Sequence, residues 1–189
     1  SFQMRDTVVR EKVRFHNRYG IELAGERPGI LAGPEEREAS GGEPWQAGET
    51  IQAAIGQSSN SFTPLQIVSY VATIVNGGTY YRPHLLKAVH SYDYSSAVYE
   101  QLPEADSKIE IAPENYRAIM EGMRSVTEDG TASSVFRNFP ISVGGKTGSA
   151  QTRQGRHAHG VFVAFAPYDD PEIAVCVVGE YAGSGNQMA

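Results

Sequence analysis

The sequence lacks the features that mark disulfide-bonded, membrane-spanning and nucleic-acid-binding proteins. Its one cysteine, Cys176, excludes an intrachain disulfide and stands in an apolar run that favours a buried strand. No apolar stretch reaches membrane length, and no signal peptide is visible. The formal net charge is −6 without a basic cluster, so we expect no nucleic-acid partner. With 189 residues, 40% of them hydrophobic, the chain suits one domain or part of one.

The stretch with the most chemical content runs from Gly144 to Gln151 and reads Gly-Gly-Lys-Thr-Gly-Ser-Ala-Gln. A short β-branched segment precedes it and an alternating segment follows, so we expect Lys146 and Thr147 on a strand or at its end. The two glycines before Lys146 predict open space for another backbone or a ligand. An ammonium and a hydroxyl on such an edge can bind a carboxylate.

Gly-Lys-Thr runs serve more than one chemistry. A phosphate-binding loop needs a further glycine, separated from the run by four residues, and then an apolar helix. Pro140 occupies that position here, and the polar residues after Gly148 do not predict a helix. Lys-Thr-Gly is also the third motif of penicillin-binding proteins and serine β-lactamases. On the tripeptide alone, an ordinary exposed edge strand remains the alternative.

Longer stretches favour the Lys-Thr-Gly interpretation. They read Ala-Ile-Gly-Gln at 54–57, Thr-Pro-Leu-Gln at 63–66, Asn-Gly-Gly at 76–78 and Arg-Pro-His at 82–84. Together with the segment from Phe162 to Pro167, their order resembles the transpeptidase domain of class B penicillin-binding proteins, over roughly residues 18–185.

The resemblance implies an α/β fold of the α+β type, in which helices flank an antiparallel sheet. Residues 18–189 would form the C-terminal part of such a domain. Residues 1–17 show no resemblance, and we expect a solvated helix there, with a linker or a rearranged junction as alternatives.

Two helices are predicted from capping residues and apolar spacing. Thr63 caps a helix that runs to Val75 and is apolar nearly all round, which predicts burial in the interior. A second helix runs from Pro113 to about Thr127. Its expected core stripe is Tyr116, Ile119, Met120, Met123 and Val126.

The remaining segments are predicted as loops and strands. Residues 25–48 are dense in Gly, Pro and Glu and predict a loop, in which Trp45 anchors the chain. Residues 79–89 are expected to be extended, and residues 92–107 to form a surface hairpin or loop. Three strands, around Lys146, Phe162 and Val175, should lie side by side as an antiparallel sheet.

The family's nucleophile motif, Ser-x-x-Lys, is absent from the sequence. The residues three positions before the four lysines are Val9, His84, Ala105 and Val143. The second motif, Ser-x-Asn, matches at residues 58–60 and 184–186. The first match is expected to be a loop that leads into a helix, and the second follows Lys-Thr-Gly, which is the wrong order. We therefore expect the half of the domain with the nucleophile to lie outside this chain.

The resemblance implies roles for the residues around Lys-Thr-Gly. Lys146 would shape the electrostatic field at the serine, and Thr147 would bind the substrate's terminal carboxylate. The backbone N–H of Ser149 would form half of the oxyanion hole. Gly148 and Gln151 complete the expected substrate contacts.

His157 and His159 would share one face of a strand, an arrangement that metal-binding pairs also use. A metal site needs three or four ligands, however, and no acidic residue or cysteine lies nearby in sequence. We expect a polar pair beside the substrate groove, with no metal and no cofactor.

The implied activity is that of a peptidoglycan D,D-transpeptidase acting through a serine acyl-enzyme. The expected partners are stem peptides ending in D-Ala-D-Ala, β-lactams, the missing N-terminal half and the cell-wall synthesis machinery. The expected location is the outer face of the cytoplasmic membrane, with an anchor outside this chain. A β-lactamase or D,D-carboxypeptidase of the same fold and a non-catalytic penicillin sensor remain alternatives; Thr-Pro-Leu-Gln favours the transpeptidase.

Overall fold

The computed structural model describes residues 15, 17–152 and 156–189. The helix expected within residues 1–17 therefore falls almost wholly outside the described residues. No helix in the described ranges is long and apolar enough to cross a membrane.

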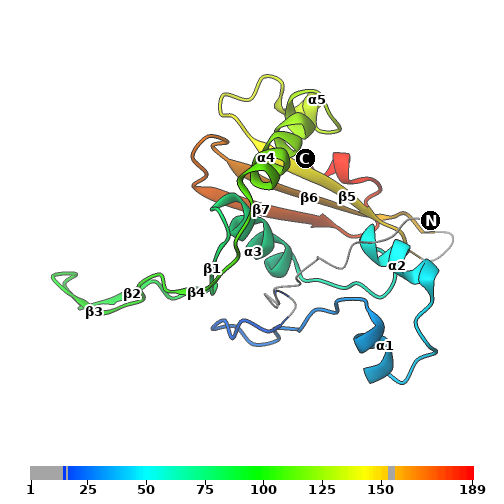
Figure 1. The fold of residues 1–189 in the computed structure, drawn as a ribbon. Coiled ribbons are helices and arrows are strands. Elements are labelled where there is room, and N and C mark those ends of the chain that lie inside the picture. The colour runs from blue at the N-terminus through cyan, green and yellow to red at the C-terminus, as the bar shows by residue number, and fades with distance from the viewer. Residues whose placement is uncertain (1–14, 16, 153–155) are drawn as a thin grey trace.

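A three-stranded antiparallel sheet forms the centre of the structure (Figure 1). It consists of β5 (Gly144–Ala150), β6 (His159–Ala166) and β7 (Ile173–Gly179), in that order. Lys146 pairs with Val163, and Val163 pairs with Cys176. The predicted antiparallel neighbourhood of the three strands is confirmed.

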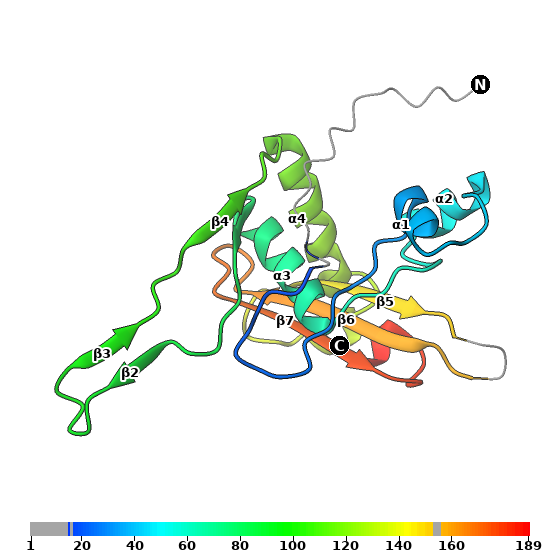
Figure 2. The same cartoon turned by 90° about the horizontal axis from the view of Figure 1, so that it is seen from below.

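Two helices pack on one face of this sheet (Figures 1 and 2). They are α3 (Pro64–Val75) and α4 (Pro113–Glu128), close to the predicted boundaries. The buried core between helices and sheet consists of Val71, Val75, Met120, Val163 and Phe165. Mixed helices and antiparallel strands confirm the predicted fold class.

Capping residues start α3 as predicted, but burial differs between its faces. Thr63 Oγ1 accepts the N–H of Gln66, and the Gln66 side chain accepts the N–H of Thr63. Leu65, Val68 and Ala72 instead line an open hollow of about 280 Å³. All-round burial of this helix was therefore a wrong expectation, because Thr79, Tyr81 and Ala174 border this hollow without filling it and leave that face only half-buried.

The expected core stripe of α4 is only partly buried. Met120 is buried, with Tyr116 and Met123 packed against the core. Ile119, in contrast, is exposed, so its predicted place in the core is wrong. A rotation of one residue along a helix moves a side chain about 100° around its axis, which takes Ile119 off the face that Met120 presents.

A long two-stranded arm projects from the body of the structure (Figure 2). At its base, β1 (Thr79–Tyr81) pairs with β4 (Ala105–Lys108), and further out β2 (Ala88–His90) pairs with β3 (Ala97–Glu100). Residues 92–107, expected to form a surface hairpin or loop, supply only the turn and most of the returning side of this hairpin, whose other side lies within residues 79–90. Residues 79–89 are only partly strand, because residues 82–87 separate β1 from β2.

The N-terminal part contains two short helices, α1 (Pro34–Ala39) and α2 (Ala47–Ala54). A loop throughout residues 25–48 is therefore a wrong prediction. The start signals were present, since α1 begins with a proline and has acidic residues in its first turn. Trp45 anchors this region locally, by donating from Nε1 to Thr50 Oγ1 at 2.9 Å.

Candidate functional site

The candidate site lies at the exposed edge of the central sheet. Among the described strands, β5 has only β6 as a neighbour, so its other edge is free. Lys146 is exposed on this strand and Thr147 is half-buried. Adjacent residues of a strand point to opposite faces. A ligand held by both side chains must therefore lie along the edge rather than on one face of the sheet.

The two glycines before Lys146 serve packing in the described structure. A β-carbon at Gly144 would overlap the ring of Phe165, and one at Gly145 would lie 2.8 Å from Phe162 Cζ. The space predicted for a ligand or another backbone is thus filled by two aromatic rings from β6. Glycines here let β5 approach rings that would otherwise push it away.

Thr131 is a functional candidate that sequence reasoning missed. It follows α4 in the turn that leads to α5 (Ser133–Phe136), and its Oγ1 lies 2.9 Å from Thr147 Oγ1. Either hydroxyl can donate in this pair. In the sequence, Gly130-Thr131-Ala132 stands between the second predicted helix and the Lys-Thr-Gly strand, and no local pattern indicates that Thr131 meets Thr147.

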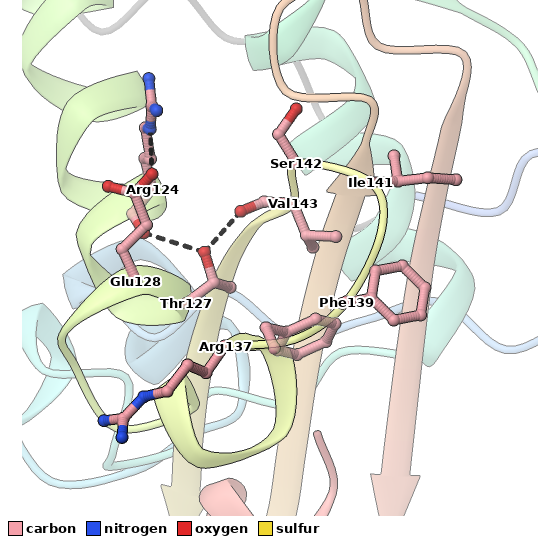
Figure 3. A pocket seen from close by; sticks show the side chains of 9 residues that line it. Arg124, Thr127, Glu128, Arg137, Phe139, Ile141, Ser142 and Val143 are labelled. Carbon is pink, nitrogen blue, oxygen red and sulfur yellow. Dashed lines mark hydrogen bonds and ion pairs between the residues drawn. The ribbon is translucent and has the colours of Figure 1, made fainter.

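The turn with Thr131 is held in place by contacts at both ends of its segment. Ala132 has no exposed surface, and its N–H donates to Val126 O of α4 at 3.0 Å. Thr127 Oγ1 lies 2.5 Å from Val143 O, directly before β5 (Figure 3). Helix α4 and strand β5 are thus fixed to each other next to the threonine pair.

The Lys146 ammonium bends back and donates to the carbonyl oxygen of Thr147. Among the residues that the structure describes, no carboxylate forms an ion pair with it. An exposed ammonium beside a hydroxyl pair is an attractive environment for a carboxylate, because charge-assisted hydrogen bonds are the stronger kind.

The side chain of Ser149 is hydrogen-bonded to the C-terminal segment of the chain. Its Oγ accepts the backbone N–H of Gly185 at 3.0 Å, in the 3₁₀ helix η1 (Gly185–Gln187). The Ser149 hydroxyl is therefore already engaged in a hydrogen bond within the chain. Gly148 precedes Ser149 on β5, and Gln151 lies exposed just beyond the end of the strand.

The Ser-x-Asn match at residues 58–60 is a structural loop, as expected. Asn60 Oδ1 accepts the N–H of Ala32, and its Nδ2 donates to the carbonyl oxygens of Ala53 and Gln57. With its donors and acceptor engaged in holding the loop, Asn60 has no free group for catalysis.

The two histidines do not form a pair. His159 Nδ1 accepts the backbone N–H of Tyr181 at 3.0 Å, and the ring centroids of His159 and Tyr181 lie 4.6 Å apart. His157 is exposed. No group of three metal-binding side chains occurs in the described ranges.

A separate pocket of about 350 Å³ opens where the chain enters β5 (Figure 3). It is lined by Arg124, Thr127, Glu128, Phe136, Arg137, Phe139, Ile141, Ser142 and Val143. None of the predicted site residues belongs to it. Arg124 is paired with Glu128 at 2.6 Å, so its charge is already compensated.

The Lys-Thr-Gly run thus lies at an open edge of an antiparallel sheet that is backed by helices, next to a pair of threonine hydroxyls. The family model of the penicillin-binding protein transpeptidase domain matches residues 7–188. The chain belongs to this family.

The sequence relatives and solved structures agree with the family. The chain is 32% identical to the peptidoglycan D,D-transpeptidase MrdA of Acinetobacter baumannii, a match that covers 93% of the chain and 28% of that protein. It is also similar to Pseudomonas aeruginosa PBP2 in complex with WCK 5153, at 30% identity and a TM-score of 0.77, over 93% of this chain and 38% of that one. Helicobacter pylori PBP2 in complex with MreC gives 27% identity and a TM-score of 0.73, over 92% and 31% of the two chains. The chain thus spans about a quarter of the length of its curated relative.

Proposed function

We propose that this chain forms the Lys-Thr-Gly side of the active site of a peptidoglycan D,D-transpeptidase. Residues 18–189 then make up part of the transpeptidase domain, and the serine nucleophile comes from polypeptide outside the chain. Family membership and the MrdA relatives support this proposal. The observation that carries it is the free β5 edge, where the half-buried Thr147 is hydrogen-bonded to Thr131 beside the exposed Lys146.

The proposed substrate is a stem peptide that ends in D-Ala-D-Ala. Thr147 donates its one hydroxyl proton to the terminal carboxylate, so the Thr131 hydroxyl donates to the Thr147 oxygen in the second hydrogen bond of the pair. The positive charge of Lys146 attracts the same carboxylate. It also stabilises the negative charge that develops near the serine during the reaction. A β-lactam, which also carries a carboxylate beside its reactive carbonyl, uses the same contacts.

The reaction divides into two acyl transfers. The serine oxygen attacks the carbonyl of the penultimate D-Ala, the C–N bond breaks, and the terminal D-Ala leaves with the serine proton on its amine. The amine of a second stem peptide then attacks the ester and releases the serine with its proton. In both steps the carbonyl oxygen gains negative charge, which the N–H of Ser149 stabilises. Gly148 lets the peptide lie close to β5, and Gln151 contacts it further along.

The proposed setting is the cell-wall synthesis machinery at the outer face of the cytoplasmic membrane. The relatives are penicillin-binding proteins, and the Helicobacter pylori relative was solved in complex with MreC. An analogous complex of the protein that contains this chain is part of the proposal.

A β-lactamase or a D,D-carboxypeptidase would use water in the second step instead of an amine. A non-catalytic penicillin sensor is the other alternative, and it requires that the complete protein lack Ser-x-x-Lys. The experiment is to incubate the complete natural protein with a fluorescent penicillin and, separately, with donor and acceptor stem peptides. A transpeptidase gives a covalent label and a cross-linked dimer. Label with hydrolysed donor alone indicates the carboxypeptidase, and no label refutes the proposal.

A further inference from the structure

A row of three cross-strand neighbours crosses the sheet two residues beyond Thr147. Ser149 pairs with Gly160, and Gly160 pairs with Gly179. Residues paired across neighbouring strands point to the same face. Because two of the three have no side chain, this face carries a trench that begins at Ser149.

The C-terminal segment lies in this trench. A β-carbon at Gly160 would lie 2.7 Å from Met188 Cγ, and one at Gly179 would overlap Met188 Sδ. The thioether therefore occupies the space that the missing side chains leave. The segment is also tied to the strand connection, since Gly183 N–H donates to Ala158 O at 3.1 Å.

The same segment reaches β5 at Ser149. Gly185 N–H donates to Ser149 Oγ at 3.0 Å, and Gly185 is buried. A β-carbon at Gly185 would lie 2.6 Å from both Gly148 N and Val161 O. The backbone of the segment is thus pressed against the third residue of Lys-Thr-Gly, at a distance that only glycine permits.

We propose that residues 184–188 form a clamp that positions Ser149 and thereby the oxyanion hole. The inference rests on the proposed function, in which the Ser149 N–H stabilises the charged carbonyl oxygen. In the described structure β5 is paired on one side only, so the hydrogen bond from Gly185 is a second restraint on this part of the strand. An oxyanion donor must lie within a few tenths of an ångström of its best position. In this proposal the Ser-Gly-Asn run at 184–186 restrains β5 at Ser149 and does not act as a Ser-x-Asn motif.

The test uses the complete natural protein and separates the Ser149 side chain from its backbone. Ser149→Ala keeps the N–H but removes the acceptor of the Gly185 bond, whereas Ser149→Thr keeps a hydroxyl. Gly185→Ala forces the segment away from Gly148. Gly122→Ala, on an open face of α4, is the matched control. For each variant the acylation rate constant and the pre-acylation binding constant for a penicillin are measured, together with the melting temperature.

We expect Ser149→Ala and Gly185→Ala to lower the acylation rate constant by about tenfold, with the binding constant little changed. The melting temperature should stay near that of the wild type in Ser149→Ala and fall in Gly185→Ala, because the added β-carbon meets the backbone of Gly148. Ser149→Thr should restore most of the rate, and Gly122→Ala should match the wild type. If Gly185→Ala does not fold, the Ser149→Ala and Ser149→Thr pair decides alone. Wild-type acylation in Ser149→Ala, while Lys146→Ala abolishes acylation, would overturn the clamp and leave the proposed function standing. A wild-type protein that is not acylated at all would overturn both.

Discussion

The hydroxyl oxygens of Thr131 and Thr147 lie 2.9 Å apart, although sixteen positions separate the two residues in the chain. One follows helix α4 and the other lies on the edge strand β5. The pair fixes the rotamer of Thr147 and leaves the other lone pairs and proton of the hydroxyls for a ligand. The side chain that is expected to bind the substrate carboxylate is therefore oriented before the substrate arrives.

Replacing Thr147 should slow acylation without unfolding the protein. In the complete protein, Thr147→Val removes the hydrogen bond to the carboxylate and little volume, and a bond to a charged group contributes about 1.5–3 kcal/mol. We expect the second-order acylation rate by a penicillin to fall about tenfold or more. Thr131→Val should have a smaller effect, because it changes only the orientation of Thr147.

Thr79→Val is the control for this comparison, since Thr79 lies on β1 in a different sheet. It should acylate at the wild-type rate. An unchanged rate in Thr147→Val, measured by stopped-flow or gel-based labelling, would remove Thr147 from the site.

The isolated 189-residue chain should form no covalent adduct with a β-lactam. Ser-x-x-Lys does not occur in its sequence, and a serine hydroxyl without an adjacent base is a weak nucleophile. Ser149 is the serine nearest to Lys146 on β5, but its hydroxyl accepts the N–H of Gly185. Intact-mass spectrometry after incubation with penicillin should show the unmodified mass. A stoichiometric penicilloyl adduct would contradict the expectation that the nucleophile lies outside this chain.

Gly144→Ala should destabilise the complete protein. The new β-carbon would overlap the ring of Phe165, a residue with 1% of its surface exposed, so the ring and β5 must separate. Overpacking of this kind costs about 1–3 kcal/mol. Gly122→Ala, with nothing near the added carbon, should be neutral or slightly stabilising because alanine favours helix. Equal melting temperatures for the two variants would show that β5 tolerates the larger residue.

The thiol of Cys176 should react slowly at neutral pH. Burial raises the pKa of the Cys176 thiol, because the charged thiolate is poorly solvated at this half-buried position on β7. A raised pKa means less thiolate at any given pH, so alkylation should lag behind that of a free cysteine and accelerate only at alkaline pH. The rate of iodoacetamide labelling between neutral and alkaline pH measures this. A rate equal to that of glutathione at neutral pH would contradict it.

The isolated chain should self-associate. Ile173, Val175 and Val177 are exposed on one face of β7, and Leu65 and Val68 line the open hollow beside α3. Uncovered apolar faces tend to recruit partners. Sedimentation analysis should detect dimers or larger species, and co-production with the N-terminal half of the domain should yield a defined complex instead. A stable monomer at high concentration would argue against this.

Local residue patterns predicted the elements in which one signal dominates. The helix that begins after Thr63 combines a capping box, a proline at its first position and two closing glycines, so its boundaries follow from local chemistry. The three central strands alternate and are joined by short connections, which favours antiparallel neighbours. The loop predicted for residues 25–48 failed because Gly-rich composition outweighed the start signals of α1.

For the site, the amino-acid sequence alone predicts the chemistry: a lysine, a threonine and small residues on one strand, in a family order that predicts the kind of reaction. Which partners these residues meet depends on the tertiary packing. It filled the space beside Gly144 and Gly145 with the rings of Phe165 and Phe162, and it brought Thr131 to Thr147 and Gly185 to Ser149. Such contacts join segments far apart in the chain. They depend on how strands and helices pack, which the local propensities of the residues do not encode.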